Sequence, residues 1–430
     1  MSLASAIDRA RDSSELQGKR VAMVLFSYYP SDPRPRRAAE ALVGAGMEVD
    51  LICLRESATD SVSTVVKGVN VRRVPMARRR GGILGYLYQY LAFFLISSAI
   101  IIRRSFTHRY AMVYVHNMPD FLVFAGTVPK LMGAKVVLDL HDPMPELMQT
   151  IFDLPATARS VSVLKFIERW SLRFADSVIT VNRACAKLFA SRGCPSSKIS
   201  VVMNSPDEEI FRPKPSSVKS PLNGSKPFVV MYHGSLVERN GLGLAIEAFA
   251  RLRSSVPSAE LRIYGTQNSF LERVMQSVRS QGLEDCVRYL GPKPLEQIVE
   301  AIGQCDVGVI PNQRSIFTEL NTPTRIFEYL ALGKPVIAPN APGITDYFDG
   351  ESLIYFDLGN AEDLAQKLEY TFRNPEKVRE TARRGQEIHL RHTWRAERGT
   401  LLNLVSSLLG SAPVQSPATM GAGSRNQPGS

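Results

Sequence analysis

Short apolar runs alternate with stretches of helical spacing along most of the chain. An apolar run at 20–26 predicts a buried strand, a helical pattern follows at 37–45, and a second apolar run lies at 47–54. A strand, a helix and a second strand in this order are typical of a parallel sheet. The same pattern predicts further strands at 69–74, 111–116, 134–140, 177–181 and 199–203.

A polar stretch rich in Pro, Ser, Gly and Lys at 213–227 interrupts this pattern and has the composition of a linker. A second series of alternating elements begins with the apolar run at 228–233. It predicts a second α/β unit, with strands at 260–264, 287–290, 306–310 and 335–338, and helices at 242–252, 268–281, 294–303, 323–332 and 361–373.

The expected fold class is α/β, with two Rossmann-like domains that face a central cleft. A length of 430 residues is too great for one core and suits two domains. Such folds bind ligands at the carboxyl ends of their strands, so the cleft is the expected site. The expected organisation is a flexible N-terminus at 1–18, an N-terminal domain at 19–212, the linker at 213–227, a C-terminal domain at 228–390, a helix at 391–409 that packs back on the N-terminal domain, and a disordered tail at 410–430.

Cysteine spacing and net charge indicate the cellular compartment and the kind of partner. The five cysteines are scattered and never spaced as CxxC, which argues against a disulfide framework or a zinc site and favours a reducing, cytoplasmic compartment. The formal net charge is +11, with arginines gathered at 34–37, 72–80 and 103–109. No nucleic-acid motif accompanies them, so nucleic acid is not an expected partner, and an anionic membrane surface is favoured.

The segment 83–102 is almost wholly apolar and lies between two arginine clusters. Its length suffices for a membrane span, but positive charge at both ends gives no orientation. The favoured interpretation is a core helix of the first domain that also touches the inner face of a membrane, with Tyr86, Tyr88 and Tyr90 at headgroup level. A plain core helix and a true span remain the alternatives.

The stretch 321–339 carries the clearest chemical signal. Thr322 is suited to cap a helix and Pro323 to occupy its first position. The free N–H groups and dipole of a helix start attract an anion, and Arg325 in the first turn is favourable only when an anion is present. Glu328, one turn further on, suits hydrogen bonds to a ribose. An ordinary capped surface helix is the alternative.

This stretch, NTPTRIFEYLALGKPVIAP, resembles the donor-binding helix of retaining glycosyltransferase family 4, a group 1 glycosyltransferase family of GT-B fold. Four other segments resemble the family in its own order and extend the similarity from residue 20 to about 405. They are YYPSDPRPRRAAEALVGAGMEVDLICL, VLDLHDPMPE, ITVNRACAKLFASRGCPSSKISVVMNSPDEEIFRP and MYHGSLVERNGL.

The resemblance implies transfer of a sugar, with retention, from a UDP- or GDP-sugar to a glycan or lipid-linked acceptor in bacterial polysaccharide or glycolipid biosynthesis. The nucleotide-sugar is a substrate, and no cofactor or metal is expected. The implied catalytic residues are His141, Asp142, Arg325 and Glu328. The implied donor-binding residues are Gly234, Ser235, Arg239, Asn240, Gly291, Pro311, Asn312, Thr322, Pro323, Arg325 and Glu328.

The acceptor side is expected at the segment 31–37, which the sequence predicts as a Pro/Arg loop. Arg34, Arg36 and Arg37 on this loop are suited to bind a lipid-linked diphosphate, and a solvated basic face is the equal alternative. Asn204 is expected near the hinge between the domains.

Three positions depart from the family pattern. Leu320 stands where members often carry Glu, and Ser235 and Asn240 stand where many carry Arg and Lys. The diphosphate must then be held by Arg239, Arg325 and backbone N–H groups. These departures keep two alternatives open, a non-catalytic GT-B partner protein at the membrane and a nucleotide-sugar epimerase.

Overall fold

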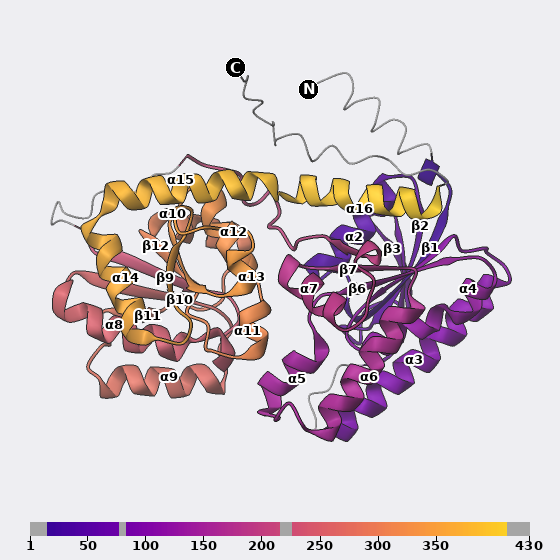
Figure 1. Cartoon of the computed structure of the whole chain (residues 1–430), viewed down its shortest axis with the longest axis horizontal. Helices are drawn as coiled ribbons and strands as arrows, with labels where there is room; N and C mark the ends of the chain where they lie inside the picture. The colour runs from indigo at the N-terminus through magenta and orange to yellow at the C-terminus, as the bar shows by residue number, and fades with distance from the viewer. Residues whose placement is uncertain (1–14, 77–82, 216–225, 411–430) are drawn as a thin grey trace, which may run out of the picture.

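The computed structural model describes residues 15–76, 83–215 and 226–410. They form two α/β domains side by side, each built on its own sheet, with two C-terminal helices running across both (Figure 1). This arrangement confirms the expected fold class. The predicted tail beyond residue 410 and most of the predicted linker lie outside the described residues.

The N-terminal sheet has the strand order β3-β4-β2-β1-β5-β6-β7-β8, parallel except for the β3–β4 pair. Its strands are β1 (Arg20–Tyr28), β2 (Glu48–Leu54), β3 (Ser63–Val66), β4 (Val69–Val74), β5 (Met112–His116), β6 (Lys135–Leu140), β7 (Ser177–Thr180) and β8 (Ile199–Val201). The helices around it are α2 (Pro33–Gly44), α3 (Ile83–Ser105), η1 (Asp120–Gly126), α4 (Thr127–Leu131), α5 (Met144–Phe152), α6 (Arg159–Phe174), α7 (Arg183–Ser191) and η2 (Ser196–Lys198).

The C-terminal sheet has the order β11-β10-β9-β12-β13-β14 and is parallel throughout. Its strands are β9 (Phe228–His233), β10 (Ala259–Tyr264), β11 (Val287–Tyr289), β12 (Val307–Val309), β13 (Val336–Asn340) and β14 (Ile354–Asp357). Its helices are η4 (Glu238–Asn240), α8 (Leu242–Ser255), α9 (Ser269–Ser280), α10 (Leu295–Gln304), α11 (Ile316–Leu320), α12 (Thr324–Ala331), α13 (Pro342–Thr345) and α14 (Ala361–Arg373).

Two long helices end the described chain, α15 (Pro375–Arg391) on the C-terminal domain and α16 (Trp394–Leu409) on the N-terminal domain (Figure 1). Leu401 and Val405 of α16 lie in the N-terminal core beside Leu16, which is fully buried. The prediction of a flexible N-terminus is therefore wrong for 15–18, because α16 and the turn at Gly46 hold this segment in place.

The predicted loop at 31–37 is also wrong, because helix α2 already begins at Pro33. Proline fixes φ near its helical value and lacks an N–H that the first turn leaves unpaired anyway, so it suits a helix start. Arg34, Arg36 and Arg37 therefore lie on the first turns of a helix. The sequence pattern also missed the short strands β3 and β14.

Helix α3 covers the segment expected as an apolar helix. Tyr90 and Phe93 pack edge-on against Phe26 of β1, so one side of α3 belongs to the core. The expectation of three tyrosines at headgroup level is wrong for Tyr90, which is buried, whereas Tyr88 is 73% exposed. The helix is long and apolar enough to cross a membrane. One side of it, however, packs in the core of the N-terminal domain, so a membrane span would have to remove α3 from that core.

Candidate active site

The carboxyl ends of strands from both sheets lie at the interface between the domains. His141 and Asp142 follow β6 in the first sheet, and Gly234 follows β9 in the second. Helix α12, which carries Arg325 and Glu328, begins beside these ends. The structure thus brings the four expected catalytic side chains to one region, contributed by both domains.

Glu328 and His233 form the centre of the C-terminal half of this region. The His233 Nε2 atom lies 2.6 Å from Glu328 Oε2, and the His233 Nδ1 atom lies 2.8 Å from the Tyr329 hydroxyl. Tyr329 is fully buried and its hydroxyl donates to the Met231 carbonyl. A carboxylate on α12 is therefore fixed through an imidazole to the core of the domain. His233 lies in the segment MYHGSLVERNGL but was not selected as a site residue, because spacing along the chain does not indicate its contact with Glu328.

Arg325 lies along the turn that follows β9. Its Nη1 donates to the His233 carbonyl at 2.7 Å, and its guanidinium lies over the Tyr232 ring, 5.0 Å from the centroid. Gly234 has a φ of +114°, and a Cβ there would come within 3.1 Å of Arg325 Cδ. The positive φ favours glycine at this position, and a side chain there would also press on Arg325.

The helix start differs from the prediction. Pro323 is the N-cap of α12 and makes no side-chain cap, and the first helical residue is Thr324. Thr322 was expected to cap the helix, but its hydroxyl donates to the Gly343 carbonyl and accepts from Asn182 of the other domain. Its capping oxygen is thus engaged between domains, and the N–H groups at the start of α12 keep no side-chain partner there.

The turn at Gly241 packs on the segment after β12. Gly241 has a φ of +73°, and a Cβ there would lie 1.6 Å from the Pro311 carbonyl oxygen. Next to it, Asn312 is 1% exposed, and neither its amide nitrogen nor its oxygen finds a partner within the described residues. An unpaired buried amide costs about 1–3 kcal/mol per group, so the side chain of Asn312 calls for a polar partner that the described residues do not supply.

The loop 235–240 completes the C-terminal side. Ser235 is exposed, and its carbonyl accepts from the Asn240 amide at 2.9 Å. Arg239 lies over the Phe317 ring, 5.9 Å from the centroid. Gly291, also expected near the donor, is half-exposed in the turn after β11, and its carbonyl accepts from Gly265.

On the N-terminal side, Asp139 is the hub of a buried network. Its two oxygens accept from Arg34 Nη2 at 2.6 Å and from the Tyr114 hydroxyl at 2.8 Å. His116 Nδ1 lies 3.3 Å from Asp139 and 3.0 Å from His141 Nε2. His141 is thus tied through a second histidine to a carboxylate, an arrangement that fixes its ring.

These contacts set the charge states of the network. Burial works to raise the pKa of Asp139, but the Arg34 guanidinium and the two histidines outweigh it and hold this pKa well below its usual range. Burial, together with Arg34, lowers the pKa of His141 to about 4 against the opposing pull of Asp139. Burial raises the pKa of Asp142, opposed by Arg239 and Arg34. His141 is therefore neutral at neutral pH, and both arginines act on Asp142 from opposite domains.

His116, Asp139 and His141 also form a group whose ligand atoms lie within 4.8 Å of one another, as in some metal centres. Both Asp139 oxygens are already bonded, one of them to a guanidinium that would repel a metal ion. The group fits a hydrogen-bonded network better than a metal site. That the reaction needs no metal stays a prediction.

The three arginines expected on the acceptor side differ in exposure. Arg37 is buried and bonds the Ser205 carbonyl and the Asn204 amide oxygen, and burial lowers its pKa to about 10. Arg34 is 11% exposed and bound to Asp139, whereas Arg36 keeps 29% of its side chain exposed, 3.8 Å from Asp207. Arg36 is the most exposed of the three.

Asn204 joins the two domains at the site. Its side chain accepts from Arg37 and donates to the Thr324 hydroxyl at 3.1 Å. On the opposite side of the interface, Asn182 donates to the Leu320 carbonyl at 2.8 Å. The small crevice lined by His141, Asp142, Asn182, Phe317 and Leu320 encloses almost no free volume, so side chains of the two domains are in close contact at this point.

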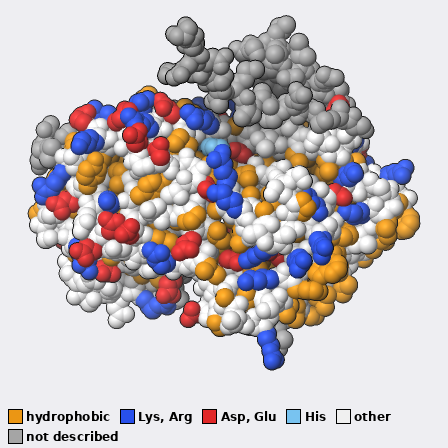
Figure 2. All heavy atoms as spheres, in the orientation of Figure 1, with side chains coloured by type: hydrophobic (Ala, Val, Ile, Leu, Met, Phe, Trp, Pro, Cys, Tyr) orange, Lys and Arg blue, Asp and Glu red, His pale blue; other side chains and the backbone are white. Residues whose placement is uncertain are grey.

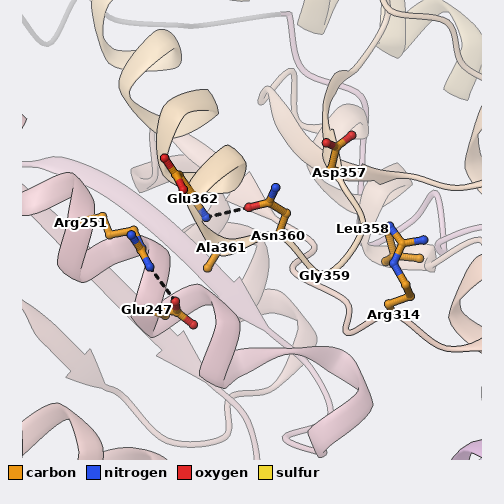
Figure 3. A pocket seen from close by; sticks show the side chains of 9 residues that line it. All are labelled: Glu247, Arg251, Arg314, Asp357, Leu358, Gly359, Asn360, Ala361 and Glu362. Atoms are coloured by element: carbon orange, nitrogen blue, oxygen red, sulfur yellow. Dashed lines mark hydrogen bonds and ion pairs between the residues drawn. The ribbon is translucent and has the colours of Figure 1, made fainter.

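A larger hollow of about 680 Å³ lies elsewhere, on the C-terminal domain between α8 and α14 (Figure 3). It is open and polar, with the Glu247–Arg251 pair at one wall and Asn360 capping α14 at the other. None of the site residues expected from the sequence lines it. Because it lacks the network described above, it is not the candidate site.

Two family models match the chain, one for each domain. The glycosyl transferase 4-like domain matches residues 32–205, and the glycosyl transferases group 1 model matches residues 214–388. The matches follow one another along the chain and together cover most of it.

Curated and solved proteins give a consistent picture. The amylovoran biosynthesis glycosyltransferase AmsK of Erwinia amylovora is 28% identical over 176 residues, which are 40% of this chain and 42% of AmsK. The match thus spans less than half of that relative. Sucrose-phosphate synthase from Thermosynechococcus elongatus has a TM-score of 0.73 at 17% identity, over 92% of this chain and all of that one.

HepE of Anabaena, solved in complex with UDP, has a TM-score of 0.68 at 17% identity, over 90% of this chain and all of HepE. At such identities the structural likeness establishes the fold. The chain thus carries a glycosyl transferase 4-like domain followed by a group 1 glycosyl transferase domain on the two-domain GT-B fold, and it is a glycosyltransferase.

Proposed function

We propose that the chain transfers a sugar, with retention, from a UDP- or GDP-sugar to a glycan or lipid-linked acceptor in polysaccharide or glycolipid biosynthesis. The observation that carries the proposal is the convergence of Arg325, Glu328 and the His141–Asp142 pair at one interface. HepE was solved with UDP and with UDP-glucose, and AmsK is named for amylovoran biosynthesis. Both support a nucleotide-sugar donor and a polysaccharide pathway.

In this proposal, Glu328 accepts hydrogen bonds from the donor ribose. His233 holds its carboxylate in place before the donor arrives. Asn312, whose amide is buried and unpartnered, offers a donor and an acceptor to the sugar.

The diphosphate lies between Arg325, Arg239 and the start of α12. Cations and free N–H groups stabilise the charge that develops on a departing diphosphate, which is the largest contribution in sites of this kind. Neither a metal ion nor another cofactor is required by this scheme, because the two guanidiniums supply the countercharge.

The acceptor attacks on the face from which the diphosphate leaves, and the leaving phosphate takes its proton. This accounts for retention without a second catalytic carboxylate. His141 is neutral, since burial lowers its pKa to about 4, and its fixed ring offers a hydrogen bond to the donor sugar. Arg36 is the arginine left to guide an anionic acceptor.

The absence of CxxC spacing and the basic surface support a cytoplasmic protein at the inner face of the plasma membrane. Leu320, Ser235 and Asn240 depart from the usual pattern, and they are the reason to keep a non-catalytic partner protein and an epimerase as outcomes of the test.

The experiment is slow donor hydrolysis by the purified protein across a panel of UDP-, GDP- and ADP-sugars. The expected result is hydrolysis of one donor that is lost in Glu328→Ala and Arg325→Ala but kept in Arg251→Ala, a control on the separate hollow. If no donor in the panel is hydrolysed and no nucleotide shifts the melting temperature, the proposal is contradicted and a non-catalytic partner protein is favoured. Isomerised free sugar nucleotide without an acceptor identifies an epimerase instead.

A further inference from the structure

Large apolar side chains are exposed on two helices of the N-terminal domain. On α3, Tyr88, Leu91 and Leu95 are 73%, 50% and 57% exposed. On α6, Val163, Phe166 and Trp170 are 55%, 62% and 50% exposed. Figure 2 shows apolar atoms gathered where α3 and α6 lie in Figure 1. An apolar surface of this kind marks an interaction site.

Both stripes follow helical geometry and lie opposite a buried side. The three residues of each helix are spaced i, i+3 and i+7, which places them on one face. The other face of α3 holds Phe93 and Ile101, both fully buried. The buried residues of α6 are Val161, Glu168, Ser171 and Leu172. On both helices the exposed apolar stripe is therefore not explained by packing in the core.

Helices α3 and α6 both pack against the short helix η1. Phe94 of α3 packs edge-on against Phe121 of η1, and Phe174 of α6 packs against Phe124 of the same η1. The two helices thus flank η1. We call the stripes of α3 and α6 together the apolar face.

The exposed charges on these two helices are all positive in the described residues. No Asp or Glu occurs in 83–105, and the single acid in 159–174, Glu168, is buried and bound to Arg192. Arg103, Arg169 and Arg173 are exposed, and Arg173 lies over the Trp170 ring. Arg78, Arg79 and Arg80, which precede α3, lie outside the described residues. An exposed apolar face on two helices whose own exposed charges, among the described residues, are all cationic is complementary to anionic lipid.

We propose that the apolar face seats the N-terminal domain on an anionic lipid bilayer. The face lies in the interface, with Tyr88 and Trp170 at the headgroups and the leucines and Phe166 among the acyl chains. It does not span the bilayer, because withdrawing α3 would expose Phe93 and Ile101 and open the core. This inference does not depend on the proposed reaction.

The test is co-sedimentation of the full chain with vesicles of phosphatidylcholine, with or without phosphatidylglycerol, in the absence of any sugar nucleotide. We expect binding only to the anionic vesicles and a loss of about tenfold or more in Leu91→Asp/Phe166→Asp. Arg169→Gln/Arg173→Gln is expected to bind anionic vesicles more weakly than the unmodified chain at low salt, with a smaller difference at high salt. The matched control is Leu295→Asp/Leu390→Asp, which changes leucines 48% and 49% exposed on the C-terminal domain.

Light scattering in solution and the melting temperature of each variant complete the test. Equal binding by the Leu91→Asp/Phe166→Asp variant and the unmodified chain overturns the proposal. So does a change from dimer to monomer in this variant with no anionic vesicle binding in either protein, which identifies the face as a contact between two copies. Unchanged donor hydrolysis without lipid in the same variant separates failure of docking from failure of the reaction.

Discussion

The His233 imidazole holds the Glu328 carboxylate at 2.6 Å, and the Tyr329 hydroxyl holds the other nitrogen of the same ring at 2.8 Å. Strand β9 and helix α12 are thereby joined at the point where the donor ribose is proposed to bind. A fixed acceptor loses less entropy on binding than a mobile one, so His233 acts as a positioning residue.

Replacing His233 tests this positioning role. We expect His233→Phe to raise the donor KM about threefold to tenfold with little change in kcat. This corresponds to a loss of binding free energy of about 1 kcal/mol, the net contribution of one hydrogen bond. His233→Gln, which keeps a donor, is expected to recover part of the loss. Steady-state kinetics with the donor found in the panel measures both values. A fall in kcat at unchanged KM would contradict a role in binding.

Substitution of His141 should separate chemistry from nucleotide binding. Because His141 lies on the N-terminal domain, His141→Phe is expected to lower kcat about a hundredfold, within the range for removing one fixed polar group from a transition state. The affinity for the free nucleoside diphosphate should stay unchanged. Calorimetry with the nucleotide measures the affinity, and kinetics with the donor measures kcat. An equal loss of nucleotide affinity and of kcat would contradict a contact of His141 with the sugar.

Two neighbouring glycines provide a matched pair. Gly241→Ala places a Cβ 1.6 Å from the Pro311 carbonyl at a φ of +73°, whereas Gly243→Ala meets nothing within 4 Å. Gly241→Ala is expected to lower the melting temperature and displace Asn312, with loss of activity. Gly243 lies inside α8, where alanine stabilises a helix by about 0.5–1 kcal/mol. Thermal melts compare the two, and equal stability would contradict the packing described at Gly241.

The buried His389 predicts a pH dependence of stability. Burial lowers its pKa from 6.5 to about 4, so between these values the unfolded chain binds a proton that the folded chain does not. The contribution of His389 is therefore complete above pH 6.5 and is lost as the pH falls to 4.

Buried Glu168 acts in the opposite direction, since burial raises its pKa to about 7. The dependence of the unfolding free energy of the whole protein on pH therefore combines a stabilising and a destabilising contribution. The informative quantity is the difference in unfolding free energy between His389→Phe and the unmodified chain. It should shift in favour of the variant as the pH falls from 6.5 to 4. A difference that is constant over this range would contradict the lowered pKa.

The sequence predicted the two parallel sheets because strands such as β1, β5 and β9 are largely apolar runs, and it placed helix 361–373 at its observed bounds. It failed at Pro33, where two prolines were taken for a loop although proline suits a helix start. It failed at Thr322 because a capping residue is recognised by type, whereas its hydroxyl is engaged by Gly343, which is distant in the chain.

The site shows the same division. Arg325 and Glu328 lie in one continuous motif and were selected from the sequence. His233, His116 and Asp139 were not selected as site residues, because their importance comes from contacts between strands that spacing along the chain does not encode. Arg37 was expected at the surface, and only the fold reveals its burial against Asn204.

The most direct test of the account is the affinity of the protein for UDP and GDP, measured by calorimetry on the unmodified chain, Glu328→Ala, Arg325→Ala and the control Glu247→Ala. We expect one nucleotide to bind and each of the first two variants to weaken it about a hundredfold, since hydrogen bonds to charged groups contribute about 1.5–3 kcal/mol each. Glu247→Ala, on the separate hollow, should bind as the unmodified chain does. Equal affinity in all four proteins would contradict the placement of the donor at α12.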